Sequence, residues 1–444
     1  MNGKLNVKRT ILVGFAFFLI SAFWQSYDKI VPLILTQRFG MNQTVSGVIM
    51  SLDNVFAVFM LPIFGALSDK VSTKYGRRTP FILLGTVIAV VFYVFLSIAP
   101  SLWLFILLLL ATLISMATFR SPAVALMPDV TEKPLRSKGN AVINLMGTAG
   151  GISVLAVGLV IKTGEAHAEN YPIYVATVCF IMIAALTVFL LTVKEVPWAQ
   201  EADARNRALE ASAPAKENAS ETVIKHKLSK EEFFSLCLIL ASVALWFTGY
   251  NAVTSKFSVY VEAVLPPRDA VTGAVLGDPV VSYDLALIIA QIAAIIAYIP
   301  VGLIASRIGR KKSILAGIVM LSVAFGFAGL INASTPPIPM YLLFALAGIG
   351  WATINVNSFP MVVELATGSD VGKYTGYYYT ASMSAQIITP ILSGFLVDKL
   401  GWGIFFPYAA IFAALSFVTM LFVKHGDAKA EKKGSLLEHL DTDD

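Results

Sequence analysis

Two carboxylate residues, Asp28 and Asp53, lie inside long apolar stretches of the sequence. An aspartate near the centre of a membrane helix is unfavourable by about 2.5–3.5 kcal/mol on insertion scales, so such a residue must face a polar cavity or a partner. A carboxyl group in low-dielectric surroundings can exchange a proton near neutral pH. We therefore expect at least one of the two, Asp28 before Asp53, to handle protons. The alternative is a structural ion pair with Lys29 or Arg120.

Aromatic and amide side chains accompany these carboxylates at helical spacing. Trp24 lies four residues before Asp28, and Trp246 lies four residues before Tyr250, so each pair shares one helix face. Aromatic rings stack on the C–H faces of sugar rings, and amides bond sugar hydroxyls. We predict a cavity for a sugar-like ligand, while an aromatic stripe alone is also typical of helix packing. The predicted binding residues are Trp24, Tyr27, Arg120, Asn140, Asn144, Trp246, Tyr250, Asn251, Gln291, Trp351, Asn355, Tyr378 and Gln386.

The elements that carry these residues must be membrane helices. The chain has 444 residues, 57% of them hydrophobic and 14% charged, whereas a soluble protein carries roughly 25% charged residues. Spanning hydrocarbon takes about 20 apolar residues per helix. We predict an all-α polytopic membrane protein with twelve spans, at about 11–35, 45–67, 81–99, 102–126, 139–161, 172–193, 233–262, 285–306, 314–333, 340–363, 376–398 and 404–423.

A polar segment between the sixth and seventh spans divides the chain into two pseudo-symmetric halves. Within it, Ser229 and Glu232 form a capping box that predicts the start of the seventh span. The stretch "WQSYDK" in the first span parallels "FTGYNA" in the seventh, and "GALSDKVSTKYGRR" parallels "GLIASRIGRKK". Such repeats are typical of transporters with a midplane site. The expected parts are a six-helix bundle, a linker, a second six-helix bundle and a tail, at 1–193, 194–232, 233–423 and 424–444.

The distribution of basic residues predicts which side each loop faces. Of the 33 Lys and Arg residues, three lie in spans and four face outward if both termini are cytoplasmic, which leaves 26 inside. The net charge of +5 therefore reflects cytoplasmic loops, and it requires no nucleic-acid partner. Lys29 and Lys256 lie nearer the outer ends of their spans, so we expect them to reach the lipid headgroups.

The stretch "GALSDKVSTKYGRRTPFI", from Gly65 to Ile82, contains the most specific motif. Gly65 permits close helix contact, Asp69 can cap a neighbouring helix, and the two arginines offer cationic forks. Exposed pairs of opposite charge are weak enough to break and reform, which suits a gate. The predicted gate residues, in both halves, are Gly65, Asp69, Arg77, Arg78, Asp129, Arg136, Arg307, Arg310 and Glu364.

This motif resembles the loop signature of the major facilitator superfamily. Its longer Gly-Arg-Arg-x-Pro-Phe-Ile form is similar to that of the plant sucrose–proton symporters and the glycoside–pentoside–hexuronide:cation symporters. The stretch "RSPAVALMPDVTEKPLRSKGNAVINLMG", which begins at Arg120, extends the likeness to the helix 4–5 region of sucrose carriers. The resemblance covers the whole chain in topology and about 45–150 in motifs. It implies symport of a glucoside, such as sucrose or maltose, with a cation by alternating access.

The chain departs from these families at their coupling positions. The helix-four arginine and aspartate of the plant carriers fall at Val124 and Leu113. The two helix-two carboxylates of the sodium-coupled branch fall at Ala57 and Leu61. Sodium coupling therefore loses support, and proton coupling requires a different carboxylate, such as Asp28.

Other protein classes lack their signatures in this sequence. There is no phosphate-binding loop and no catalytic constellation, and the cysteines and histidines form no ligand cluster, so we expect no enzyme, cofactor or metal site. A drug–proton antiporter is the nearest alternative, although "GTAGGISVLAVG" lacks the Gly-Pro pair that such carriers place in helix five. A non-transporting sugar sensor is the other. We expect a monomer in the plasma or bacterial inner membrane, with a sugar, a coupling cation (proton rather than sodium) and the lipid bilayer as partners.

Overall fold

The computed structural model describes residues 4–212, 229–365 and 371–426. Twelve of the helices in these ranges are long and apolar enough to cross a membrane. No strand occurs in these ranges. The predicted fold class, an all-helical membrane protein with twelve spans, is therefore confirmed.

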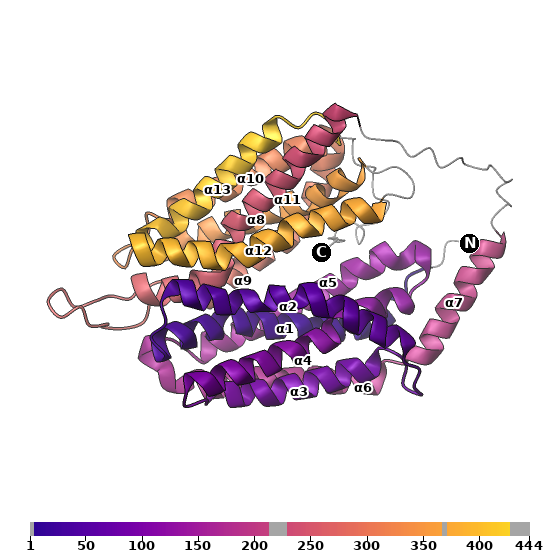
Figure 1. Cartoon of the computed structure of the whole chain (residues 1–444), viewed down its shortest axis with the longest axis horizontal. Helices are drawn as coiled ribbons and strands as arrows, with labels where there is room; N and C mark the ends of the chain where they lie inside the picture. The colour runs from indigo at the N-terminus through magenta and orange to yellow at the C-terminus, as the bar shows by residue number, and fades with distance from the viewer. Residues whose placement is uncertain (1–3, 213–228, 366–370, 427–444) are drawn as a thin grey trace.

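The first six of these helices form the N-terminal bundle (Figure 1). Side-chain caps begin three of them, because Asn6, Asn42 and Ser101 each accept a hydrogen bond from the backbone nitrogen three residues further on. The first helix continues through a π-helical segment, Ile34–Arg38. The helices are α1 (Val7–Leu33), α2 (Gln43–Lys70), α3 (Thr79–Ser97), α4 (Leu102–Asp129), α5 (Arg136–Val160) and α6 (Tyr171–Thr192).

A helix that the sequence analysis did not predict, α7 (Glu195–Ser212), occupies the first half of the linker. The second bundle follows, and the capping box of Ser229 and Glu232 at its start is confirmed. Its helices are α8 (Lys230–Val264), α9 (Tyr283–Ile308), α10 (Arg310–Ala328), α11 (Ile338–Val363), α12 (Val371–Leu400) and α13 (Phe405–Leu421).

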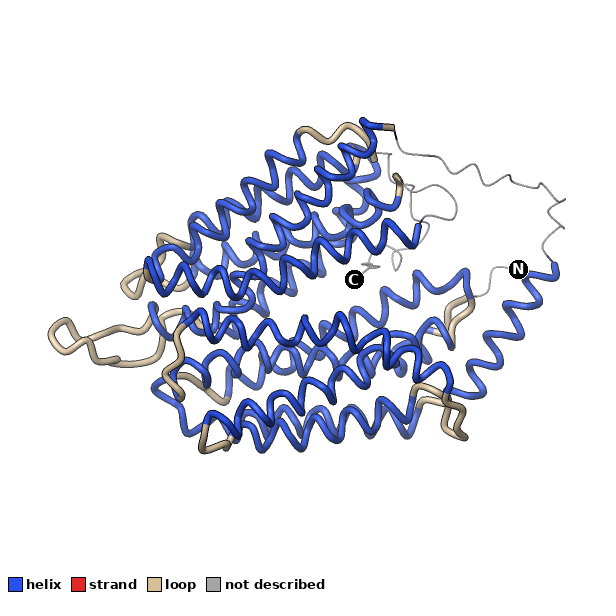
Figure 2. The backbone as a smooth tube through the Cα atoms, in the orientation of Figure 1, coloured by secondary structure: helices blue, strands red, loops and turns tan. Residues whose placement is uncertain are grey.

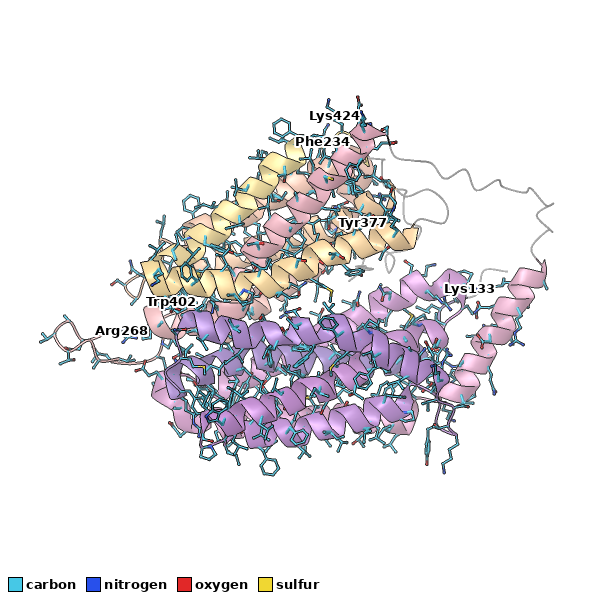
Figure 3. The ribbon with its side chains drawn as sticks, in the orientation of Figure 1. Lys133, Phe234, Arg268, Tyr377, Trp402 and Lys424 are labelled. Atoms are coloured by element: carbon cyan, nitrogen blue, oxygen red, sulfur yellow. The ribbon has the colours of Figure 1, made fainter. Side chains whose placement is uncertain are left out.

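The two bundles lie side by side, in contact at one end and diverging toward the other (Figures 1 and 2). We call the contact end the loop end, because residues 265–282 project there, and the opposite end the linker end, because α7 leaves there. Figure 3 places Arg268 and Trp402 toward the loop end and Lys133, Tyr377 and Lys424 toward the linker end. These two ends define the possible entrances to anything held between the bundles.

The interface between the bundles follows the internal repeat. α2 packs along α12, α5 packs along α9, and α1 meets α8. Exchanging the two halves converts the α2–α12 contact into the α9–α5 contact, which is the pattern expected of two repeated six-helix units. Each bundle also has its own apolar core, with Tyr27 and Tyr93 buried in the first and Trp246 and Phe257 in the second.

The expectation that Lys29 and Lys256 reach the headgroups is wrong. The two side chains are buried, with 4% and 2% of their residue surfaces exposed. Lys29 forms an ion pair with Asp284 of α9, and Lys256 donates a hydrogen bond to the backbone oxygen of Gln43 in α2. Both lysines therefore point across the interface between the bundles, where partners replace the water that a headgroup position would supply.

Candidate functional site

A cavity of about 570 Å³ lies between the two bundles. Helices of both halves line it, as expected of a ligand site at a repeat interface. Seven of the fifteen predicted binding and proton-coupling residues lie in its wall: Trp24, Asp28, Arg120, Asn144, Tyr250, Gln291 and Trp351. The structure adds polar residues that the sequence analysis did not single out, namely Ser21, Gln25, Thr148, Thr254, Tyr283 and Tyr298.

Charged groups gather on the N-terminal side of this cavity. The Arg120 guanidinium lies 5.7 Å from the centre of the Trp24 ring. Asp53 interacts electrostatically with Arg120 and with Asp28, and one Asp53 oxygen accepts hydrogen bonds from the backbone and side-chain nitrogens of Asn54. The Asp28 carboxylate lines the cavity and has no hydrogen bond to another described residue. One wall thus holds a cation and a carboxylate that a ligand or proton can reach.

Amide groups close the cavity between the two halves. The Gln291 amide of α9 donates to the Gln25 carbonyl of α1 at 2.9 Å, and the Gln25 amide donates to the Tyr283 hydroxyl at 3.4 Å. Gln25 was missed, although it is a polar residue in an apolar run like the ones that were chosen. Each of these amides has both a donor and an acceptor, so it can give up its present hydrogen bond and bond to a ligand hydroxyl instead.

Aromatic rings form the C-terminal side of the cavity. Tyr250 of α8 and Trp351 of α11 stack with ring centres 5.7 Å apart, and both line the cavity. Trp246, predicted alongside Tyr250, lies instead in the core of the bundle with no exposed surface. Its ring stacks on that of Phe247, with ring centres 3.9 Å apart. The part of α8 that lines the cavity therefore begins at Tyr250, and Trp246, one turn earlier, lies outside it.

Several other predicted residues lie outside the cavity wall. Tyr27 is fully buried in the core, and Tyr378 pairs with the hydroxyl of Ser358 at 3.0 Å. These aromatic side chains pack between helices, which is the alternative that the sequence left open. The remaining residues that do not line the cavity are Asp53, Asn140, Asn251, Asn355 and Gln386.

At the linker end, the structure brings four of the predicted gate residues together. Arg78 donates to Asp129 at 2.8 Å and to Asp69 at 2.5 Å, and it also contacts the hydroxyl of Ser68. Arg77 pairs with Asp129 at 2.7 Å. The arginines thus tie the end of α2, the start of α3 and the end of α4 into one cluster.

Glu195, the first residue of α7, bonds to this cluster, although the sequence analysis did not choose it. Its carboxylate accepts hydrogen bonds from the backbone nitrogens of Arg77, Arg78 and Thr79 at 2.7, 2.9 and 2.8 Å, and from the Thr79 hydroxyl at 2.7 Å. It therefore caps the N-terminus of α3 from another helix. Gly76 (φ 115°) lies against this carboxylate, where a side chain would collide with it.

The other predicted gate residues have simpler surroundings. Arg310 and Glu364 form an ion pair in the C-terminal bundle, at the position that mirrors the N-terminal cluster. Arg136 donates to the backbone oxygen of Pro128 at 2.9 Å, and Gly65 lies against Ser121. Arg307 lies in the last turn of α9.

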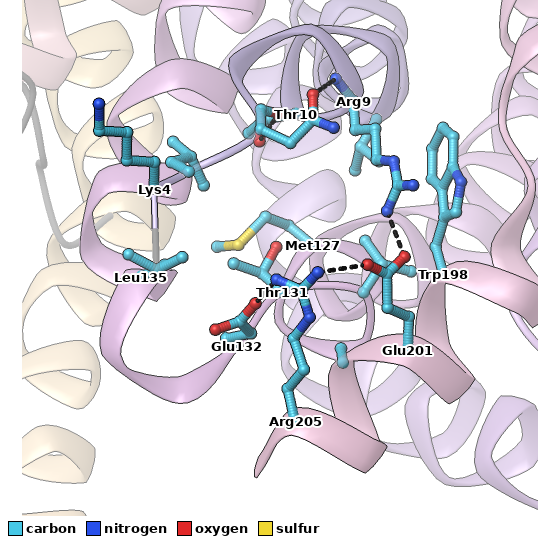
Figure 4. A pocket seen from close by; sticks show the side chains of 15 residues that line it. Lys4, Arg9, Thr10, Met127, Thr131, Glu132, Leu135, Trp198, Glu201 and Arg205 are labelled. Carbon is cyan, nitrogen blue, oxygen red and sulfur yellow. Dashed lines mark hydrogen bonds and ion pairs between the residues drawn. The ribbon is translucent and has the colours of Figure 1, made fainter. Parts of the chain in front are cut away.

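The linker helix α7 is fixed to the N-terminal bundle by a chain of charges (Figure 4). Arg9 donates to Glu201 at 2.6 Å, and Arg205 bridges Glu201 at 2.7 Å and Glu132 at 2.6 Å. The hydrogen bond from Arg9 lowers the pKa of Glu201 below its ordinary value. Arg9 also lies 5.3 Å from the Trp198 ring. These contacts surround a second, smaller hollow of about 280 Å³.

The loop end is closed by polar contacts between the two bundles. Asp398 of α12 accepts from the backbone nitrogens of Gln43 and Thr44 at 2.8 and 2.7 Å and from the Thr44 hydroxyl at 2.5 Å. It thereby caps the N-terminus of α2 from the opposite half, beside the lysine that bonds Gln43. Further out, Asp278 accepts from Lys162 at 2.5 Å and pairs with His167 at 2.8 Å.

Glycines allow the backbones to touch at this closed end. Gly47 of α2 packs on the carbonyl group of Pro390, and Gly394 of α12 packs on that of Gln43. A Cβ atom at either glycine would overlap the opposing backbone. At these two glycines, the backbones of the two bundles are therefore in direct contact.

Twelve membrane helices in two bundles around a central cavity define a transporter of the major facilitator type. The profile of the family described as "MFS/sugar transport protein" matches residues 13–369, and the chain belongs to this family. The family and fold are those of transporters, not of enzymes. In the described ranges, no group of three or more His, Cys, Asp or Glu residues could hold a metal ion.

Solved structures share the fold at low sequence identity. A point mutant of the nucleoside transporter NupG is 15% identical, with a TM-score of 0.67 over 94% of this chain and all of that chain. The inward-open xylose transporter XylE from E. coli is 14% identical, with a TM-score of 0.66 over 98% of both chains. At these identities the likeness establishes the fold alone.

Curated relatives match only short stretches of the chain. Chloramphenicol resistance protein CraA of Acinetobacter baumannii is 30% identical over 118 residues, which cover 26% of this chain and 28% of that protein. Multidrug transporter protein MdtP of Bacillus subtilis is 26% identical over 101 residues, which cover 23% of this chain and 18% of that protein. The matched region thus spans less than a third of either relative.

Proposed function

We propose that this protein is a proton-coupled sugar symporter that works by alternating access. The observation that supports it most is the composition of the central cavity. Stacked aromatic rings face amides, hydroxyls and one carboxylate across a space of about 570 Å³. Ring faces suit the C–H faces of a pyranose, and the polar groups suit its hydroxyls. A disaccharide such as sucrose or maltose is favoured by the sequence resemblance.

The linker end is proposed to face the cytoplasm, with both termini on that side. The positive-inside rule supports this orientation, because most of the Lys and Arg residues in the described ranges lie in the loops and helix ends on that side. The closed loop end then faces outward, and the cavity faces inward. The membrane is the plasma membrane or the bacterial inner membrane, and the working unit is a monomer.

Asp28 is the leading candidate for the proton-coupling residue, with Asp53 second. Asp28 lines the cavity and shares a helix face with Trp24, so a sugar and a proton could occupy adjoining positions. Asp53 does not line the cavity, and its carboxylate accepts hydrogen bonds from Asn54 and interacts electrostatically with Arg120. Asp53 is therefore the better match to the structural ion-pair alternative.

Uptake of labelled sucrose and maltose into proteoliposomes, with and without an imposed proton gradient, tests the proposal. We expect a gradient, acid outside, to drive accumulation of at least one sugar above its external concentration. In this assay Asp28→Asn should abolish gradient-driven accumulation and preserve exchange at equal concentrations, whereas Asp53→Asn should preserve both. Accumulation by both variants would exclude both carboxylates, and uptake that ignores the proton gradient would refute proton symport.

A drug–proton antiporter is the second candidate, because the local likenesses are to proteins named for chloramphenicol resistance and multidrug transport. The aromatic side of the cavity could also hold an apolar drug. Chloramphenicol transport in the same proteoliposomes discriminates the two. Proton-driven drug movement opposite to the gradient, without sugar accumulation, would favour this candidate over the symporter.

A further inference from the structure

A buried ion pair joins the two bundles near the loop end. The Lys29 ammonium of α1 lies 2.9 and 2.7 Å from the two carboxylate oxygens of Asp284, in the first turn of α9. Only 4% and 5% of the two residue surfaces are exposed. Gly158 of α5 lies against the Asp284 carboxylate, in a position where a side chain would displace it. The closed interface is thus shaped around this pair.

Lys29 has few interaction partners for its charge other than Asp284. The two hydrogen bonds found for its ammonium group both go to Asp284. The ring of Tyr174, which belongs to the same bundle as Lys29, lies 4.7 Å away, and that of Tyr283 lies 5.8 Å away. Glu262 interacts with Lys29 only electrostatically, at longer range. Asp284 is therefore the principal counter-ion of Lys29 in the closed state.

The charged pair between Lys162 and Asp278, also at the loop end, is more exposed. In the Lys162–Asp278 pair, 58% and 39% of the side-chain surfaces are exposed to solvent. Water can replace such a partner with little change in free energy. A buried pair behaves differently, because removing one partner leaves an uncompensated charge in a low-dielectric site, while removing both charges is often nearly neutral.

Alternating access changes this balance between the two states. Opening the loop end separates α1 from α9 and admits water, which solvates both charges. Closing the loop end removes both charges from water, and the free-energy cost of this step is offset only if the two charges form an ion pair. We propose that Lys29 and Asp284 are positioning residues of the transport cycle: their pairing sets how often the loop end closes. The proposal rests on alternating access and is independent of what the cavity carries.

Distance measurements between spin labels test it without any substrate. Both native cysteines, Cys179 and Cys237, are first replaced by serine. Labels at Pro100 and Leu330, which are exposed near the loop end on opposite bundles, then report the separation of the bundles. Double electron–electron resonance gives the populations of short and long distances in nanodiscs.

The single variants Asp284→Asn and Lys29→Gln should each raise the ratio of open to closed populations at least about tenfold, because each buries a lone charge on closing. The double variant Lys29→Met/Asp284→Asn should return the ratio to within about threefold of the parent. Lys29→Arg, which keeps the charge, should stay closed. The control Lys162→Gln removes an exposed lysine at the same end and should change the ratio less than about twofold.

Two results would overturn the proposal: single variants that stay as closed as the parent, or a double variant that stays as open as the singles. If a single variant does not yield monodisperse protein, the double variant and Lys29→Arg test the proposal instead. Both should be as closed as the parent, and a double variant that is mostly open would contradict the role of charge. Transport adds a second readout. The single variants should lower the maximal rate of whichever cargo is carried and leave its KM nearly unchanged. A failed sugar assay therefore leaves this test intact.

Discussion

Replacing Glu195 by alanine should destabilise the protein and slow transport. The residue is 4% exposed, and its carboxylate accepts four hydrogen bonds, three of them from the backbone nitrogens of residues 77–79, which lead into α3. Each bond contributes about 0.5–1.5 kcal/mol net, which would give about 2–6 kcal/mol for all four. Water can enter the vacated space at this end of the helix and satisfy some donors, so we expect a loss of about 2–4 kcal/mol.

Chemical denaturation of the purified protein in detergent, followed by tryptophan fluorescence, measures this loss. Uptake in proteoliposomes measures its consequence, because the same carboxylate fixes the backbone of Arg77 and Arg78 in the linker-end cluster. Glu201→Ala is the matched control: it removes an exposed carboxylate from the same helix and should change stability by less than about 1 kcal/mol. If both variants were equally stable and equally active, Glu195 would not hold the gate.

Three further predictions concern the cavity and the two ends. Trp351→Ala should weaken ligand binding by about 1–3 kcal/mol in isothermal titration, whereas Trp246→Ala should lower stability and leave the affinity unchanged. A loss of affinity in Trp246→Ala but not in Trp351→Ala would show that the ligand does not bind in this cavity. Asp69→Ala should slow transport while affinity is kept, and full uptake rates would contradict its gate role. The hydrogen bond from Lys162 lowers the pKa of Asp278, so the contact between them is fully formed at pH values above the ordinary pKa of an aspartate and is lost as the pH falls through the lowered pKa. The yield of cross-linking across the loop end should therefore change as the pH falls, and Asp278→Asn should remove this pH dependence.

The sequence predicted the helices well because hydrocarbon imposes a simple length rule. It predicted the start of α8 through the capping box, since that contact is local. It could not predict α7, whose mixed charges satisfy one another only after docking on Arg9 and Glu132. A linker with the same composition would be equally compatible with an extended chain in water.

The cavity was harder to predict than the spans. Trp246 and Tyr250 are one helical turn apart, yet one lies in the core and the other in the cavity wall. A membrane helix that is apolar all round carries no signal for which side faces its neighbours. The Lys29–Asp284 pair was missed for a related reason, since its members are 255 positions apart and belong to different halves.

The two glycine contacts at the loop end have a practical consequence. Because Gly47 and Gly394 rest directly on backbone atoms of the opposite bundle, a methyl group at either position would act as a wedge. Such an alanine would leave the cavity lining untouched, since neither glycine belongs to it. It would prevent full closure at the loop end only. Such a variant would therefore provide a means to trap and crystallise the state in which the loop end is open, with an unaltered binding site.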